Sequence, residues 1–276
     1  GRLHARLLDE VLGKHFAAAC ASLGMSPARA PVVLAAAGSY GRGAMALRSD
    51  VDVRLLAVGK ASPARALADA ILYPLWDAGL AVGHQLAVPS EMLALAKDDL
   101  ATATATYDFR TVAGDASAVA SLVAKFVARA KTRAAEMARA LAEDTKRRHE
   151  RYGDSVYLLE PDLKLGAGGL RDLEVARWML APFSSAGEDS LSVLVERGAL
   201  DARELAAARA AEAFAWRARN RLHALFDSTR RKLDAPLARQ QAGQRWLDRV
   251  PAKLFPFALE RPRRRIPQSR LGQCLG

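Results

Sequence analysis

The sequence has few of the features that mark secreted, disulfide-bonded or membrane-spanning proteins. Its 276 residues include only two cysteines, Cys20 and Cys274, too few for a disulfide framework or a zinc site. No apolar run reaches the ~18 residues that a membrane-spanning helix needs. The start of the chain lacks the apolar stretch of a signal peptide. These absences predict a protein of the reducing cytoplasm with no membrane partner. The chain begins with Gly1 and not Met, so we expect a fragment.

Acidic residues are missing from the end of the chain, and this shapes the meaning of the net charge. The formal net charge is +11, but residues 261–276 hold five arginines and no acid. Elsewhere the basic residues alternate with acids along predicted helices, which is typical of a solvated surface. We therefore expect a solvated tail and no nucleic-acid partner, with binding of nucleic acid through this tail as the weaker alternative.

A glycine-rich turn followed by two carboxylates is the strongest chemical signal in the chain. An apolar run at 32–37 predicts a buried strand that leads into the turn GSYGRG at 38–43. Glycines let backbone amides approach phosphates closely. On a strand over 50–58, Asp50 and Asp52 share one face because strand side chains alternate. Paired carboxylates suit Mg²⁺, which also binds substrate phosphates. The pattern predicts transfer of a nucleotide from a triphosphate.

The glycines alone do not identify a nucleotide site. Their order, Gly-x-x-Gly-x-Gly, differs from the dinucleotide-binding fingerprint, and no Gly-Lys-Ser/Thr follows as in a Walker A loop. A tight turn that binds nothing is therefore the alternative interpretation. The aspartates weigh against it, because carboxylates on a strand of Val and Leu are costly unless they are solvated or bind metal.

Hydrophobic periodicity changes along the chain from mixed strands and helices to helices alone. Alternating apolar residues also predict a strand at 80–88, which contains His84. We expect an α/β (α+β) domain followed by an all-α helical-bundle domain, with the active-site residues between them. The predicted parts are an N-terminal helix at 1–29, the α/β domain at 30–116, one long connecting helix at 117–150, helices at 151–240 and an irregular basic tail at 241–276, truncated or read in a shifted frame.

The turn and the aspartate pair together resemble the signature of the polymerase-beta-type nucleotidyltransferase superfamily. Within it, the chain is similar to the bacterial PII uridylyltransferase/uridylyl-removing enzyme family. Three further stretches carry this resemblance: LYPLWDAGLAVGH at 72–84, DFR and GD within 108–115, and EPDLK with GGLRD within 160–172. The last is the most family-specific, and the resemblance runs from about residue 30 to about 240.

The resemblance implies a magnesium-dependent uridylyl transfer. UMP would pass from UTP to a tyrosine hydroxyl of the PII nitrogen-signalling protein, and pyrophosphate would leave. Asp50 and Asp52 would hold one Mg²⁺ ion, or two, against the triphosphate. Gly38 and Ser39 would cradle its phosphates. The other nucleotide-binding candidates are Gly41, Arg42, Ser49, Lys164 and Arg171.

Full-length members of that family also carry a uridylyl-removing domain with a His-Asp metal pair, followed by glutamine-sensing domains. None of the five histidines here is followed by Asp. We therefore expect this chain to lack both the removing activity and glutamine sensing.

Two other functions stay open. A related enzyme could modify a different acceptor, such as a nucleotide or an antibiotic hydroxyl. A non-catalytic nucleotide- or protein-binding remnant is the second alternative. It draws support from Arg54, which shares the strand face of Asp50 and Asp52 and would compete with metal for Asp52. It also draws support from His84, which lies where many superfamily members have a third carboxylate.

Overall fold

The computed structural model describes residues 1–152, 162–184 and 189–233, apart from the side chains of 226–233. The chain forms two compact units, Gly1–Arg129 and Ala130–Gly276, and each is described by itself. The predicted tail at 241–276 and the start of the family-specific stretch, Glu160-Pro161, lie outside the described residues. In the described parts of the chain, no helix is long and apolar enough to cross a bilayer.

A small mixed sheet forms the centre of the first unit. Its order is β3-β2-β1-β5, with β4 also pairing with β2. Strand β1 is antiparallel to β2 and to β5, whereas β3 and β4 run parallel to β2. The strands predicted at 32–37 and 50–58 are confirmed. The bounds are β1 Val32–Ala36, β2 Val51–Ala57, β3 Val82–Gly83, β4 Leu86–Ala87 and β5 Arg110–Ala113.

The single strand predicted at 80–88 is wrong. The segment forms two short strands, β3 and β4, with His84 and Gln85 between them. The side chain of His84 is exposed and packs edge-on against Trp76, with ring centroids 5.1 Å apart. The alternation of apolar residues was real, but the ladder partners of β2 are 82–83 and 86–87, and His84 and Gln85 interrupt the ladder between them.

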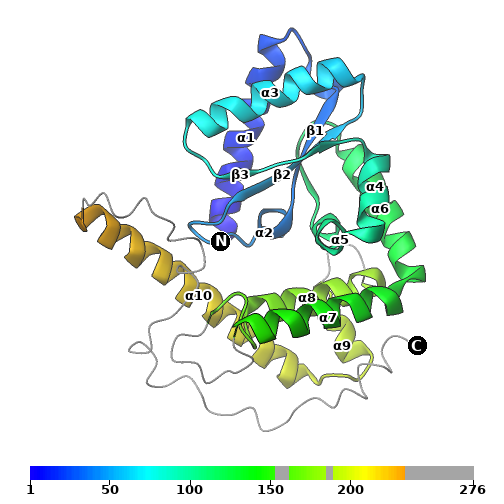
Figure 1. Ribbon diagram of the computed structural model, residues 1–276, viewed down its shortest axis with the longest axis vertical. Helices are drawn as coiled ribbons and strands as arrows, with labels where there is room; N and C mark the ends of the chain where they lie inside the picture. Colours follow the sequence, from blue (N-terminus) through cyan, green and yellow to red (C-terminus); the bar gives the residue numbers. More distant parts are fainter. Residues whose placement is uncertain (153–161, 185–188, 234–276) are drawn as a thin grey trace. The chain divides into compact units, whose positions relative to one another are not determined.

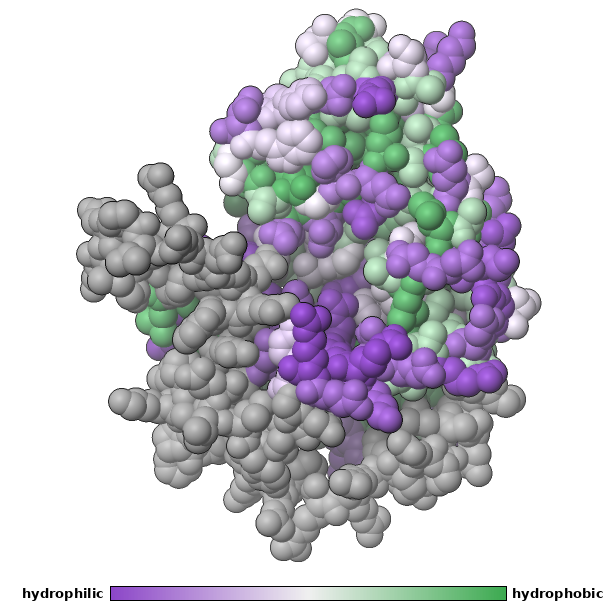
Figure 2. Space-filling view, viewed as in Figure 1, coloured by the Kyte–Doolittle hydropathy of each residue, from purple (hydrophilic) through white to green (hydrophobic). Residues whose placement is uncertain are grey.

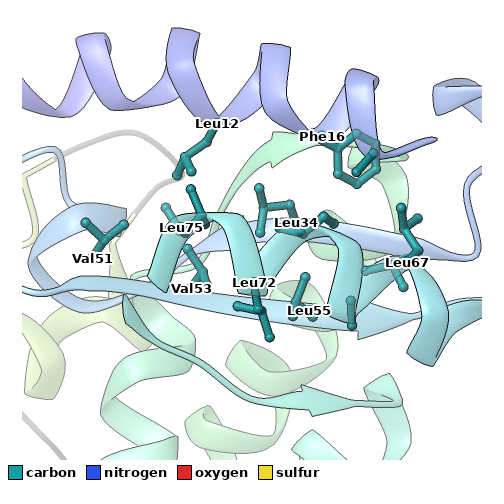
Figure 3. Packing of buried hydrophobic residues seen from close by; sticks show 14 of the residues in the cluster. Leu12, Phe16, Leu34, Val51, Val53, Leu55, Leu67, Leu72 and Leu75 are labelled. Carbon is teal, nitrogen blue, oxygen red and sulfur yellow. The ribbon is translucent and has the colours of Figure 1, made fainter. Parts of the chain in front are cut away.

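Helices cover both faces of this sheet (Figure 1). On one face, Leu12 and Phe16 of α1 and Leu72 of α3 pack against Leu34 and Leu55 of the sheet (Figure 3). On the other face, buried residues of α4 and α6 pack against the opposite side chains of β1 and β2. Alternation of buried residues along the strands explains why two separate clusters form. The helices are α1 Arg2–Ser22, η1 Pro27–Arg29, α2 Gly38–Gly41, α3 Ala61–Asp77, α4 Pro89–Asp98, α5 Leu100–Tyr107 and α6 Ala116–Thr132.

The single long helix predicted at 117–150 is also wrong. Two helices, α6 and α7, occupy the segment, and the chain turns between them at Arg133. No Gly or Pro marks the break, and the apolar stripe continues through it, so the sequence pattern could not reveal the turn. The division between the two units falls just before this turn.

The elements that the structure describes in the second unit are helices. Leu180, Leu191, Val193 and Leu205 form a small apolar cluster among them. Helix α7 has only Leu141 and Arg148 buried, and hydrophilic residues dominate the visible surface over it (Figure 2). The bounds are α7 Ala134–Tyr152, α8 Leu170–Leu180, η2 Ala181–Phe183, α9 Ser192–Glu196 and α10 Ala202–Leu233.

Candidate functional site

The carboxylate of Asp52 lies between two glycines near the start of β2. An ideal Cβ built on Gly83 would lie 2.5 Å from Asp52 Oδ1, and one on Gly38 would lie 3.3 Å from Asp52 Oδ2. Gly83 is the partner of Asp52 in the β2–β3 pair. The backbone of Gly38 has φ +53°, a conformation that favours glycine. The two glycines therefore leave the space that the carboxylate occupies.

The other predicted residues of the first unit surround the same end of β2. Asp50 immediately precedes β2 and is half-buried, as are Ser39 and Ser49. The backbone N–H of Ala37 donates to the carbonyl of Asp52 over 2.9 Å, which joins the start of the turn to β2. The hydroxyl of Ser49 accepts from the Ala46 N–H over 3.1 Å and so shapes the loop before Asp50. The structure thus gathers the turn and the aspartates in one region.

Arg54 lies on the same side of β2 as Asp52. Val51, Val53 and Leu55 are buried in the cluster on the other side of the strand, so the alternation places these two polar residues together. Nη1 of Arg54 donates to the carbonyl of Val53 over 2.9 Å. Burial lowers the pKa of the Arg54 guanidinium, and the negative charge of Asp52 opposes that shift. A fixed positive charge therefore accompanies the predicted metal ligand.

Arg42 and Gly41 both contact Asp108, the residue that follows α5. The guanidinium of Arg42 forms an ion pair with the Asp108 carboxylate. An ideal Cβ on Gly41 would lie 1.9 Å from the Asp108 carbonyl oxygen, so only glycine fits there. Arg42, predicted as a phosphate contact, is thus tied to a carboxylate within its own unit, and Gly41 serves close backbone packing.

Sequence reasoning missed a second group that contacts the glycine turn. Asp9 on α1, Tyr40 on α2 and Arg110 on β5 are joined by side-chain hydrogen bonds. Burial is the main cause that raises the pKa of Tyr40, and the neighbouring Asp9 carboxylate adds to it. The phenol therefore stays protonated and donates a hydrogen bond to Asp9. Because Asp9 and Arg110 are 101 positions apart, only the fold reveals the pair.

The glycine-rich loop of the second unit is closed by its own polar groups. Asp162 Oδ1 accepts the backbone N–H groups of Lys164 and Leu165, each over 2.8 Å. Asp172 accepts from Arg148 Nη2 over 2.6 Å and from the Gly168 N–H over 2.7 Å, and its carboxylate also lies 3.0 Å from His149 Nε2. The motif's acids and glycines therefore serve loop closure.

The predicted phosphate contacts of this loop are Lys164 and Arg171. A backbone hydrogen bond joins these two residues. The N–H of Arg171 donates to the carbonyl of Lys164 over 2.9 Å. The guanidinium of Arg171 lies 3.2 Å from Glu174 Oε2 and 5.1 Å from the centre of the Trp178 ring. These contacts account for the orientation of Arg171 within its helix, and its role toward phosphate stays a prediction.

The carboxylates of Asp50 and Asp52 suit a magnesium ion that is coordinated partly by the protein and partly by the substrate. Among the residues that the structure describes, no group of three or more His, Cys, Asp or Glu side chains could hold a metal by itself. Mg²⁺ takes one or two carboxylates and completes its shell with water and phosphate oxygens. The two aspartates fit that pattern in number and in kind, and the glycines beside Asp52 leave the space that its carboxylate occupies.

The mixed α/β unit, with its glycine turn and paired aspartates, is nucleotidyltransferase-like. Residues 135–249 match the family described as GlnD PII-uridylyltransferase. Relatives named bifunctional uridylyltransferase/uridylyl-removing enzyme occur in Novosphingobium aromaticivorans, 38% identical over 85% of this chain, and in Bradyrhizobium sp. strain ORS 278, 36% identical over 85%. A relative of the same name in Rhodospirillum rubrum is 37% identical over 72%.

The chain belongs to the PII-uridylyltransferase family, as its motifs predict. It spans about a quarter of the length of these relatives: 25% in Novosphingobium, 26% in Bradyrhizobium and 21% in Rhodospirillum. The family match covers the second unit up to residue 249, whereas the aspartate pair lies in the first unit.

Proposed function

We propose that this chain transfers UMP from UTP to a tyrosine hydroxyl of the PII signalling protein, in the cytoplasm, with Mg²⁺ bound by Asp50 and Asp52. The observation that carries the proposal is the Asp52 carboxylate, held between Gly38 and Gly83 beside the glycine turn. Membership of the uridylyltransferase family supports the choice of uridylyl as the transferred group. The fold we infer is a polymerase-beta-type domain followed by an all-α helical bundle.

The proposed reaction displaces pyrophosphate from the α-phosphorus of UTP. The tyrosine oxygen forms a bond to that phosphorus and its hydroxyl proton passes to water, while the bond to the bridging oxygen of pyrophosphate breaks. Bound Mg²⁺ would offset the phosphate charge during this exchange. The chain's own part is to orient the triphosphate: Gly38 and Ser39 offer backbone N–H groups and a hydroxyl, and Asp50 and Asp52 supply the oxygens that fix the metal. Arg42, Lys164 and Arg171 are the proposed cationic contacts to phosphate.

The test is transfer of labelled UMP from UTP to PII in the presence of Mg²⁺. Wild-type chain should label PII, and Asp50→Asn and Asp52→Asn should each lower the rate by about a thousandfold, because removal of one electrostatic element typically costs that much. Asp98→Asn, an exposed acid at the end of α4, is the matched control and should label normally. Equal labelling by all variants would contradict the proposal. Labelling of a nucleotide or aminoglycoside hydroxyl in place of PII would point to another acceptor.

A non-catalytic nucleotide-binding role is the second candidate, and Arg54 is the observation that favours it. Its guanidinium shares a strand face with Asp52 and offers a cation where metal would bind. Titration calorimetry of UTP separates the two functions. Affinity that rises with Mg²⁺ supports the transferase, whereas affinity that is the same with and without Mg²⁺ supports the binding role.

A further inference from the structure

The glycine turn is tied to α1 by a buried phenol. Tyr40 is fully buried at the third position of α2, and its hydroxyl donates to Asp9 Oδ1 over 2.8 Å. Asp9 in turn accepts hydrogen bonds from both terminal nitrogens of Arg110, from Nη1 over 2.9 Å and from Nη2 over 3.0 Å. A two-point pair of this kind fixes the plane of the guanidinium as well as its position.

The same guanidinium also reaches the backbone of the turn. Nη2 of Arg110 lies 3.4 Å from the carbonyl oxygen of Tyr40, and Nε lies 3.3 Å from that of Gly41. These carbonyls belong to the last residues of α2, and that of Tyr40 also accepts the Gly43 N–H over 3.0 Å. The guanidinium also lies 5.5 Å from the centre of the Tyr40 ring. One side chain therefore supplies four hydrogen bonds, two to Asp9 and two to the turn.

The backbone of Arg110 is anchored next to the strand that delivers the turn. In the β1–β5 pair, Arg110 is the partner of Ala36, two residues before Gly38. The side chain thus reaches from the end of β1 to the end of α2. Arg42, just after α2, pairs with Asp108, two residues before Arg110. Both ends of the turn are held by residues 108–110.

We propose that Arg110 is a positioning residue that, with Asp9, holds the glycine turn in the conformation that receives the triphosphate. This inference rests on the proposed function. Arg110 itself donates its hydrogen bonds to other protein groups, and it acts on phosphate only through the backbone of Gly38–Gly41. The pair is a local brace: the side chains of Arg110 and Asp9 are 37% and 30% exposed, and pairs with that much solvent contact add little to global stability.

The decisive variant is Arg110→Lys, which keeps the charge but loses the planar fork. Its matched control is Arg177→Lys, which removes a second two-point pair, Nη1 and Nη2 of Arg177 to Glu212 at 2.8 and 2.7 Å, in the other unit. The full chain is used for calorimetric titration with UTP and Mg²⁺, thermal melting, and hydrogen exchange of the amides of residues 38–43. Asp9→Asn serves as a second variant from the other side of the brace.

We expect Arg110→Lys and Asp9→Asn to weaken UTP binding by about tenfold and to speed exchange at 38–43 by a similar factor, the size expected for a lost charged hydrogen bond. Their melting temperatures should fall no further than that of Arg177→Lys, which should bind UTP normally. Unchanged exchange at 38–43 would overturn the inference, and so would a binding loss matched by Arg177→Lys. If the wild-type chain binds no UTP, the proposed function fails. The positioning role of Arg110 is then tested by hydrogen exchange at 38–43 alone.

Discussion

The glycines beside Asp52 and the glycines in the loop of the second unit are used in two different ways, and the contrast separates a candidate site from a structural loop. Around Asp52, a side chain on Gly83 or Gly38 would meet the oxygens of a carboxylate. In the loop of the second unit, a side chain on Gly166 or Gly169 would meet backbone carbonyls, at 2.8 Å and 2.9 Å. The first arrangement keeps space around an acid; the second keeps space for the chain itself.

Polar side chains follow the same division. In the second unit, Asp162 and Asp172 accept hydrogen bonds from the loop that contains them and from α7. These hydrogen bonds hold the loop closed. In the first unit, Asp50 and Asp52 are half-buried at the start of β2, beside the glycine turn and Arg54. A motif specific to a family can therefore build a loop, while the proposed metal ligands lie in a shorter motif.

Gly83→Ala should give the largest effect, because the new methyl would lie 2.5 Å from Asp52 Oδ1. Gly83 lies in ordinary extended backbone, so the carboxylate is the group that must turn away. We expect Mn²⁺, used as a spectroscopic stand-in for Mg²⁺, to bind about a hundredfold more weakly, with little change in the melting temperature. Gly13→Ala, whose methyl meets nothing within 4 Å, is the control. A large drop in stability with normal Mn²⁺ binding would show that Gly83 is structural.

Gly169→Ala should lower stability and leave metal binding unchanged, the reverse of Gly83→Ala. Its methyl would approach the carbonyl oxygens of Gly166, Lys164 and Leu163 at 2.9, 3.0 and 3.1 Å, and none of these atoms is a flexible side-chain end. We expect a loss of about 2 kcal/mol in the free energy of unfolding, the usual scale for overpacking. Denaturant unfolding measures it, and Mn²⁺ binding should be unchanged. A variant as stable as wild type would contradict the closed loop described above.

Arg54→Val should give the smallest effect and sharpen the comparison within the first unit. The substitution removes the positive charge beside Asp52 and fits a strand of Val and Leu. Because the pair is only partly buried, we expect Mn²⁺ to bind a few-fold more tightly, on the order of 1 kcal/mol. Arg65→Val, on α3, controls for the change in net charge alone. Weaker metal binding in Arg54→Val would instead make Arg54 part of the proposed site.

The sequence alone determined the two central strands, the glycine turn between them and the placement of Asp52 and Arg54 on one strand face, because these depend on alternation and on glycine's backbone freedom. It also determined the family, through contiguous motifs. Local patterns cannot show where a helix turns without Gly or Pro, so the break at Arg133 escaped them. Only the tertiary structure brought Asp9 to Arg110 and Gly83 to Asp52, because these contacts join segments that are far apart in the chain.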